Sequence, residues 1–293
     1  MDKVYVTGGT GFVGCHVCNR FAGEHDVVAL SRDPDETATS LDDAVERRKA
    51  DVTEPASLEF DDADVVVHLV ALSPLVQQPE GRHHEVTARG TENVVSECEE
   101  SDVDHLLHLG ALGTEDGGPT AYHEAKAAAE GAVRDSGLDA CVVRPSVVYG
   151  EGGEFEEFVF STTTPVVTAL PGGGRTRYQP LYVGDLVEMM AFAVDERVTG
   201  EFDVAGPDVL SLADVTRLVY RARGGSVRVV GVPMALARLG LGVAEHLPYP
   251  RLGLDQYRAL ESDNVLDGEN ACVRLGVDES DLTSFAGYLG VSG

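Results

Sequence analysis

Lysine is scarce in this chain of 293 residues, which contains only Lys3, Lys49 and Lys126, and tryptophan is absent. The 22 basic residues are outnumbered by 50 acidic ones, so the formal net charge is −28. Nucleic acids and anionic membranes are bound by basic surfaces, and this chain would repel both. The acidic excess favours a cytoplasm of high salt, because molar salt shortens the Debye length to about 3 Å and screens like charges.

The chain also has no long apolar run, and its number of cysteines is odd. No apolar run approaches the length of about 18 residues that a membrane span needs. Met1 to Lys3 lead directly into a strand-like segment, which predicts a cytoplasmic protein. The five cysteines favour reduced thiols. Cys15 and Cys18 have the spacing of a redox pair, but their place at a helix start favours the alternative of two small buried residues.

Strand-like and helix-like segments alternate through the first half of the chain. The expected strands are near 3–7, 26–30, 49–52, 64–70, 104–109 and 139–143, with helices around 12–22, 83–100 and 120–135. The segment 65–70 is apolar on both faces, as in a central parallel strand. This alternation predicts an α/β fold with a doubly wound parallel sheet of the Rossmann type.

The predicted domain division falls near residue 150. Residues 1–150 would form the NAD(P)-binding domain. Residues 151–293 would form mainly a smaller C-terminal substrate-side region, with part of 175–205 returning to the first domain. Helices are expected near 185–194 and 212–223. The apolar segment 233–247 is interpreted as a core or pocket-lining helix, with a partner or membrane-surface contact as the alternative.

A glycine-rich segment, TGGTGFVG, occupies residues 7–14 directly after the first expected strand. Glycines there allow a tight turn, a close approach of the backbone to a pyrophosphate and close packing of helix on strand. The N–H groups at the start of the following helix face the phosphates. The position of this motif at a strand-to-helix junction predicts dinucleotide binding.

The residues after the second expected strand bear on the choice between NAD and NADP. A carboxylate at this place would bind the ribose hydroxyls of NAD, but Ser31 stands there and Arg32 follows it. A guanidinium group favours a 2′-phosphate. We therefore expect NADP(H) to be preferred, with NAD(H) as the alternative that Asp33 would restore.

Tyr122 and Lys126 are four residues apart, so they share one face of the expected helix. A fixed cation beside a phenol favours the phenolate and makes the phenol a better general acid or base. Because lysine is so rare here, its presence at this spacing indicates a functional demand.

These segments resemble the short-chain dehydrogenase/reductase superfamily, in its extended or atypical branch of NAD-dependent epimerases and dehydratases. Four features occur in that family's order: the glycine loop, Asp51 after the third strand, the Tyr-x-x-x-Lys pair and RPSVVYG over 144–150. The resemblance extends to nearly the whole chain through PLYVGD over 180–185 and DVAGP over 203–207. The segment from 233 to 265 is more similar to relatives of the nucleotide-binding accessory subunit of respiratory complex I. The expected cofactor contacts are Gly8, Thr10, Gly11, Phe12, Val13, Ser31, Arg32, Asp51, Val52, Ala71, Tyr122, Lys126, Pro145 and Val148.

The sequence departs from that family at two positions. Active members usually carry Ser or Thr at the end of the fifth strand, but Gly110 and Ala111 stand there and have no hydroxyl. Thr114 would supply one only if the loop folds back. Thr87 replaces the family's frequent Asn, which weakens the case for a proton relay.

Several other histidines and arginines are interpreted mainly as ordinary structural or surface residues. His105 and His108 are three apart on an expected strand, so they point to opposite faces, and no metal site is predicted. The pair His83–His84 is expected to face solvent at a helix start. Arg175 and Arg177 would hold a phosphate or carboxylate, or else pair with the abundant surface acids.

Three functions remain open at this point. The leading hypothesis is hydride transfer between NADP(H) and a small-molecule carbonyl or alcohol, with Tyr122 moving the proton and Lys126 assisting it. A nucleotide-sugar epimerase or dehydratase that retains NAD is the second. A non-catalytic, cofactor-bound subunit or assembly factor of an NADH dehydrogenase assembly is the third, and the missing hydroxyl favours it. A homodimer or a respiratory-complex partner is compatible with these hypotheses.

Overall fold

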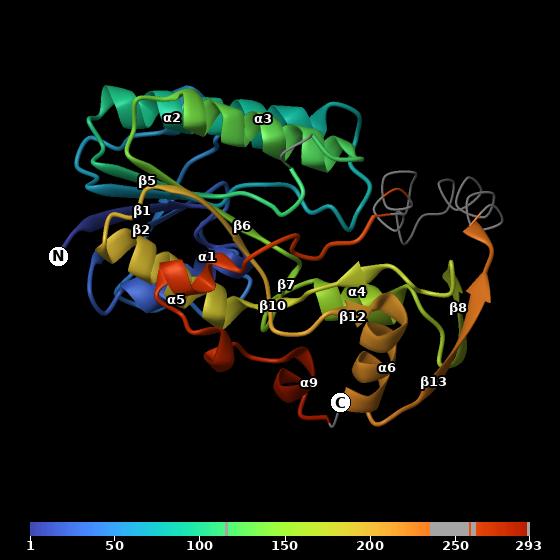
Figure 1. Ribbon diagram of the computed structural model, residues 1–293. Helices are drawn as coiled ribbons and strands as arrows, with labels where there is room; N and C mark the ends of the chain where they lie inside the picture. The colour runs from blue at the N-terminus through green and yellow to red at the C-terminus, as the bar shows by residue number, and fades with distance from the viewer. Residues whose placement is uncertain (115–116, 235–257, 259–261, 292–293) are drawn as a thin grey trace.

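A seven-stranded parallel sheet forms the centre of the computed structural model, which describes residues 1–114, 117–234, 258 and 262–291 (Figure 1). The strand order is β11-β6-β5-β4-β1-β2-β3, and every neighbouring pair is parallel. This order confirms the predicted doubly wound Rossmann sheet. The strands are β1 (Lys3–Thr7), β2 (Asp26–Ser31), β3 (Glu46–Lys49), β4 (Val65–His68), β5 (His105–Leu109), β6 (Ala140–Pro145) and β11 (Gly200–Val204).

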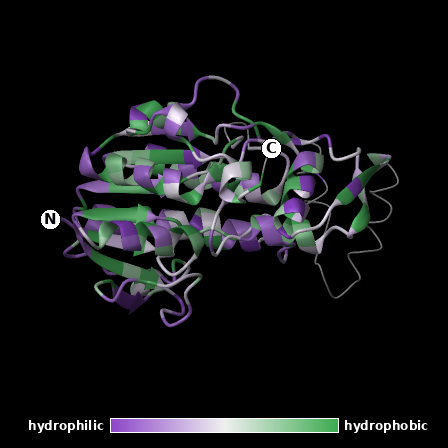
Figure 2. Cartoon of the chain, turned by 90° about the horizontal axis from the view of Figure 1, so that it is seen from below, coloured by the Kyte–Doolittle hydropathy of each residue, from purple (hydrophilic) through white to green (hydrophobic). Residues whose placement is uncertain are grey.

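Helices cover both faces of this sheet. In Figure 1, α2 (Gly90–Glu100) and α3 (Ala121–Asp135) lie above it, and α1 (Phe12–Phe21) and α5 (Val183–Asp195) lie below it. Successive strand residues point to opposite faces, so Val4 and Val6 belong to the core under α1 and α5, whereas Tyr5 belongs to the other core. Figure 2 shows the matching pattern, with hydrophobic colour along the strands and mixed colour on the helices.

The second half of the chain contributes to the sheet and also builds a separate region. β11 adds an edge strand beside β6, and α5 packs below the sheet. The remainder carries a third apolar core around Tyr149, Phe155 and Phe285. Its elements are β7 (Val148–Tyr149), α4 (Phe155–Ser161), β8 (Val166–Pro171), β9 (Arg177–Tyr178), β10 (Leu181–Tyr182), β12 (Leu210–Ser211), α6 (Leu212–Ala222), β13 (Val227–Val232), η3 (Ala271–Leu275), η4 (Glu279–Asp281) and α9 (Phe285–Tyr288).

Two expected elements differ from those observed. The third strand was predicted at 49–52 on its apolar residues, but β3 is Glu46–Lys49, an edge strand whose charged side chains suit an exposed edge. Ala50 and Val52 follow the strand and are buried beneath the cavity described below. The expected helix 83–100 is divided into η2 (His84–Arg89), with π-helical geometry, and α2. A short helical turn, η1 (Pro55–Ser57), precedes β4.

The remaining local predictions have clear outcomes. Cys15 and Cys18 are free, fully buried residues of α1, which confirms the structural interpretation of that pair. The expected helices at 185–194 and 212–223 are α5 and α6. The apolar segment 233–247 lies, from residue 235 onward, outside the described residues.

Candidate functional site

The glycine loop between β1 and α1 has the tight geometry that the sequence predicts. Gly8 has a positive φ of 76°, and its N–H donates to the carbonyl of Leu30 at 2.8 Å. A Cβ on Gly14 would lie only 2.1 Å from the Gly8 carbonyl oxygen, so α1 could not pack this closely with any other residue there. No side chain caps the N-terminus of α1. Its first N–H groups are therefore suited to an anion at this point.

A cavity of about 1660 Å³ opens at the carboxyl edge of the sheet, and is lined there by the strand ends and the loops that follow them. This volume exceeds the range of about 300–1,000 Å³ that is usual for a single small ligand. All fourteen expected cofactor contacts line it: Gly8, Thr10, Gly11, Phe12, Val13, Ser31, Arg32, Asp51, Val52, Ala71, Tyr122, Lys126, Pro145 and Val148. The tertiary structure thus brings together residues at the ends of five strands of the sheet, two residues of α3 and one of β7.

The residues after β2 and β3 fit the ribose end of a dinucleotide. Ser31 Oγ is buried in the cavity wall and has no hydrogen-bond partner within the described part of the chain. Arg32 is exposed and lies beside Asp51. Burial alone would raise the pKa of the Asp51 carboxyl, but hydrogen bonds from Thr53 and the nearby Arg32 charge lower it. The Ser31 hydroxyl, which has no partner among the described residues, and the adjacent Arg32 guanidinium suit a cofactor ribose with or without a 2′-phosphate.

Tyr122 and Lys126 share one face of α3, but the cation does not activate the phenol as we expected. Thr120 caps this helix, so Tyr122 falls in its first turn and Lys126 one turn later. Burial raises the pKa of the Tyr122 phenol, and the Glu130 carboxylate raises it further. Burial also lowers the pKa of Lys126 to about 8. The Lys126 ammonium donates to the Leu109 carbonyl. The expected lowering of the phenol pKa is therefore wrong, because burial and the Glu130 carboxylate both raise it.

The loop after β5 explains the missing hydroxyl. A Cβ on Gly110 would lie 2.5 Å from Glu130 Oε1 and 2.9 Å from Arg144 Cγ, so a serine there would displace this pair. Thr114 does not line the cavity; it is buried, and its hydroxyl donates to Glu130 Oε1 at 2.9 Å and to the Ala111 carbonyl at 2.8 Å. The loop does fold back, but toward Glu130. Thr114 is therefore not a substrate-facing hydroxyl.

Glu130 and Arg144 form a buried ion pair that sequence analysis missed. Glu130 Oε2 accepts from Arg144 Nε at 2.7 Å, and both side chains are nearly inaccessible. Arg144 also contacts Glu201 and Asp203 on β11. One signal could have found Glu130: it lies four residues after Lys126, on the face that Tyr122 and Lys126 share. The pair anchors the loop that forms the cavity wall.

A buried polar layer lies behind this wall, between the sheet and η2. The ring nitrogens of His68 lie 2.6 Å from Thr7 Oγ1 and 2.9 Å from Thr91 Oγ1. Its ring stacks on His108 with centroids 5.2 Å apart. Burial, reinforced by Lys126, lowers the pKa of His68 to about 3 and that of His108 well below its ordinary value. Both imidazoles are therefore neutral at pH 7, and Thr87 is buried nearby on η2 without lining the cavity.

The positions of two histidines and two arginines decide the remaining expectations. His83 is buried with its ring against Tyr122, with centroids 5.9 Å apart, so the prediction that it faces solvent is wrong. His84 is exposed as expected. Arg177 pairs with Asp263, and neither Arg175 nor Arg177 lines the cavity. The surface-pairing interpretation is thereby confirmed for Arg177.

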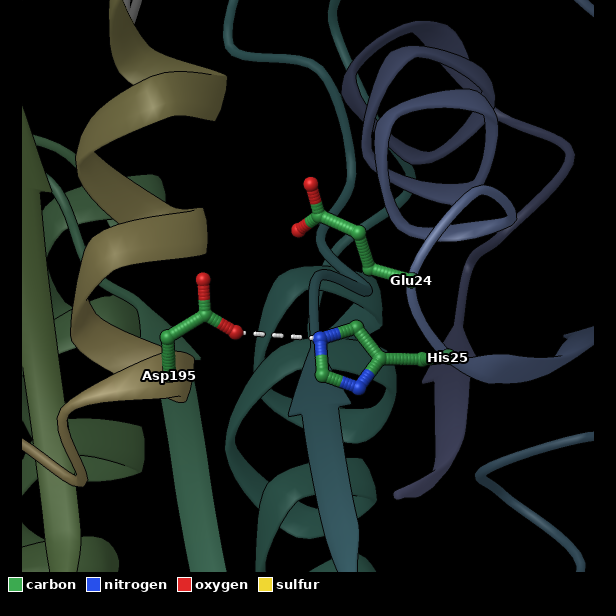
Figure 3. A group of neighbouring side chains, drawn as sticks. All are labelled: Glu24, His25 and Asp195. Carbon is green, nitrogen blue, oxygen red and sulfur yellow. Dashed lines mark hydrogen bonds and ion pairs between the residues drawn. The ribbon is translucent and has the colours of Figure 1, made fainter. Parts of the chain in front are cut away.

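One group with metal-ligand chemistry lies at the opposite edge of the sheet. Figure 3 shows Glu24, His25 and Asp195, whose ligand atoms all lie within 4.8 Å of one another. His25 Nε2 is 3.0 Å from Asp195 Oδ1, and Arg20 pairs with Glu24 at 3.0 Å. These contacts engage one ligand atom of each residue, so we interpret the group as an ion-pair cluster.

The glycine loop, the helix N-terminus and the ribose-facing residues together define a dinucleotide-binding site on a Rossmann fold. The model of the NAD dependent epimerase/dehydratase family matches residues 4–205, and the chain belongs to this family. Among the described residues, no helix is long and apolar enough to cross a membrane.

Two curated relatives are named as subunits of mitochondrial NADH dehydrogenases. The chain is 24% identical over 296 residues to the NADH-ubiquinone oxidoreductase 40 kDa subunit, mitochondrial, of Neurospora crassa, covering 96% of this chain and 76% of that protein. It is also 24% identical over 290 residues to NADH dehydrogenase [ubiquinone] 1 alpha subcomplex subunit 9, mitochondrial, of Arabidopsis thaliana, covering 89% of this chain and 70% of that protein.

Solved structures share the fold. The UDP-glucose 4-epimerase of Thermus thermophilus, in complex with NAD, superposes with a TM-score of 0.67 at 22% identity, covering 87% of this chain and 99% of that one. The crystal structure of gox2253 superposes with a TM-score of 0.72 at 21% identity, covering 94% and 93%.

Proposed function

We propose that this chain binds NADP(H) in the cavity and retains it as a resident cofactor, as a component of an NADH dehydrogenase-type assembly in a salt-rich cytoplasm. The observation that carries the proposal is the wall at Gly110, where the Glu130–Arg144 pair fills the space that a side chain on Gly110 would need. The names of the two respiratory relatives support the assembly partner. NAD(H) is the alternative cofactor.

The residues of the cavity divide the task of holding this cofactor. The N-terminus of α1 and the glycine loop would bind the pyrophosphate, and Ser31 and Arg32 would bind the adenosine ribose and its 2′-phosphate. Lys126 and Tyr122 would contact the nicotinamide end. When bound, the nicotinamide supplies hydride chemistry, but the loop after β5 presents Gly110 and Ala111 to the cavity and no hydroxyl to position a reacting oxygen.

The test is purification in molar KCl without added nucleotide, followed by identification of what denaturation releases and by exchange against labelled NADPH. We expect NADP(H) at close to one per chain, exchanging over hours. An empty site, or exchange within seconds, would refute the resident role. Co-purification of the native protein in a large assembly tests the partner, and a solitary species would count against it.

Hydride transfer to a carbonyl or alcohol is the second candidate, favoured by the presence of both Tyr122 and Lys126 in the cavity wall. Here Tyr122 would hold or release the proton, and Lys126 would bind the nicotinamide ribose. Tyr122→Phe should then abolish turnover and leave cofactor affinity unchanged. Undiminished turnover in that variant would exclude proton transfer through Tyr122.

A further inference from the structure

The cavity extends well beyond the expected cofactor contacts into the region of α4, β8 and α6, which Figure 1 shows to one side of the central sheet. We call this extension the distal arm. Its wall is mainly aromatic and aliphatic, and includes Phe155, Phe158, Val159, Leu170, Tyr178, Leu212 and Val232. Its polar groups are the Tyr178 phenol and the side chains of Thr162, Thr163, Ser262, Asp263 and Asn264. Dispersion and apolar burial would dominate any binding here.

Thr162, Thr163, Asp263 and Asn264 in the distal arm are already engaged. The hydroxyls of Thr162 and Thr163 each donate at 2.7 Å to a carbonyl one turn back in α4. Both carboxylate oxygens of Asp263 accept from Arg177, and Asn264 Oδ1 accepts from the N–H of Val147 at 2.8 Å. These groups are therefore not arranged to recognise a polar ligand.

Charge in the cavity is distributed unevenly. Within the described part of the wall, Arg32 and Lys126 are the only lysine or arginine side chains, and both belong to the dinucleotide end. Glu154 brings negative charge toward the distal arm, and the charge of Asp263 is paired with Arg177. A nucleoside diphosphate would meet no lysine or arginine among the described residues of the arm, whereas an uncharged ligand needs none.

We propose that the distal arm binds an uncharged ligand through an alkyl chain, next to the nicotinamide end of the cofactor. The proposal goes beyond the proposed function and relies on it only in assigning the rest of the cavity to a dinucleotide. It also makes a sugar nucleotide a poor ligand for this chain.

The experiment is calorimetric titration of the full chain, saturated with NADPH in molar KCl, with 1-decanol, 1-butanol and UDP as three separate probes. We expect saturable 1-decanol binding at one per chain, at least 20-fold tighter than 1-butanol because of the added methylene groups. UDP should give no saturable signal. Saturable UDP binding at micromolar concentration, or 1-decanol binding without saturation, would overturn the proposal.

Two phenylalanines of α4 provide matched variants. Phe158 lines the distal arm, whereas Phe160 does not and stacks under Arg223 instead. Phe158→Ala should weaken 1-decanol binding at least fivefold, and Phe160→Ala should leave it unchanged. Equal losses in both variants would contradict a site in the arm. NADPH titration of each variant separates this outcome from failure of the cofactor site, since loss of NADPH binding with intact 1-decanol binding would refute only the proposed function.

Discussion

The two ends of the cavity are lined by different kinds of chemical groups. At the dinucleotide end, glycines, backbone N–H groups and the charged Arg32 and Asp51 gather at neighbouring strand ends. In the distal arm, side chains of α4, β8, β9 and α6 form a mainly apolar wall, in which the Thr162 hydroxyl bonds the helix backbone and Asp263 pairs with Arg177. Between them lies the loop that the Glu130–Arg144 pair anchors. One end therefore depends on close backbone approach, and the other depends on side-chain packing.

This contrast shows how one fold separates cofactor binding from ligand choice. The parallel sheet places the strand ends at one edge whatever their side chains are, so the cofactor site follows from topology. The distal arm is formed by connections outside the main sheet, where packing rather than backbone geometry decides the shape. Substitutions should therefore affect the two ends independently.

The largest expected effect is at Gly14. Gly14→Ala would bring a Cβ to 2.1 Å from the Gly8 carbonyl oxygen, so the loop must open or α1 must shift. We expect NADPH affinity to fall by more than about 100-fold, measured by fluorescence titration, because the phosphate site is built on that contact. Gly23→Ala is the control, since a Cβ there meets nothing within 4 Å. Wild-type NADPH affinity in the Gly14 variant would show that the contact is not required.

The next effect concerns the wall between the two ends. Glu130→Ala would remove the carboxylate that pairs with Arg144. The same carboxylate accepts hydrogen bonds from the Ala111 N–H and the Thr114 hydroxyl, and these would be lost too. Breaking a buried pair in this way should cost about 3 kcal/mol of the free energy of unfolding, measured by denaturant titration in molar KCl. The control is Arg134→Ala, one turn further along α3, which breaks an exposed pair with Glu201. Exposed pairs contribute about 0–1 kcal/mol, so equal losses would contradict the distinction.

Arg32 tests the dinucleotide end alone. Arg32→Asp should weaken NADPH binding about 10- to 100-fold, as expected for one charge-assisted phosphate contact. NADH binding should change much less. Arg47→Asp makes the same charge change on the exposed edge strand β3 and should affect neither cofactor. Equal losses of NADPH and NADH in the Arg32 variant would show that Arg32 does not bind the 2′-phosphate.

The smallest effect lies in the polar layer behind the wall. Neither ring nitrogen of His108 has a hydrogen-bond partner among the described residues. Replacing the ring by an apolar one of similar shape, His108→Phe, should therefore raise the free energy of unfolding by about 1 kcal/mol at pH 7.5. A loss of stability instead would indicate that bound water satisfies the imidazole.

The same variant has a predicted pH dependence. Burial holds the pKa of folded His108 well below its ordinary value of 6.5, so the unfolded chain takes up the proton first as the pH falls. The wild type then loses stability below about pH 6.5, and the variant lacks this contribution. The difference between the two should widen from pH 7.5 to pH 5.5, and a constant difference would contradict the burial of a neutral His108.

Much of the dinucleotide end was predictable. TGGTGFVG predicted the turn because only glycine tolerates the positive φ of Gly8 and the contact at Gly14. The buried strands were recognised by their apolar runs, but β3 was misplaced because it is charged and lies at an edge. Tyr122 and Lys126 were found by spacing, yet the direction of the Tyr122 pKa shift was wrong, since spacing reports proximity and not burial.

The sequence by itself determined the parallel sheet, the phosphate-binding turn and the absence of a hydroxyl at Gly110, because these follow from local backbone preference and residue identity. Only the tertiary structure decided that Glu130 and Arg144 occupy the space beside Gly110, that Thr114 turns toward Glu130, and that α4, β8 and α6 enclose an apolar arm. Such features join residues far apart along the chain. Their energies come from burial and long-range contact, which no local pattern encodes.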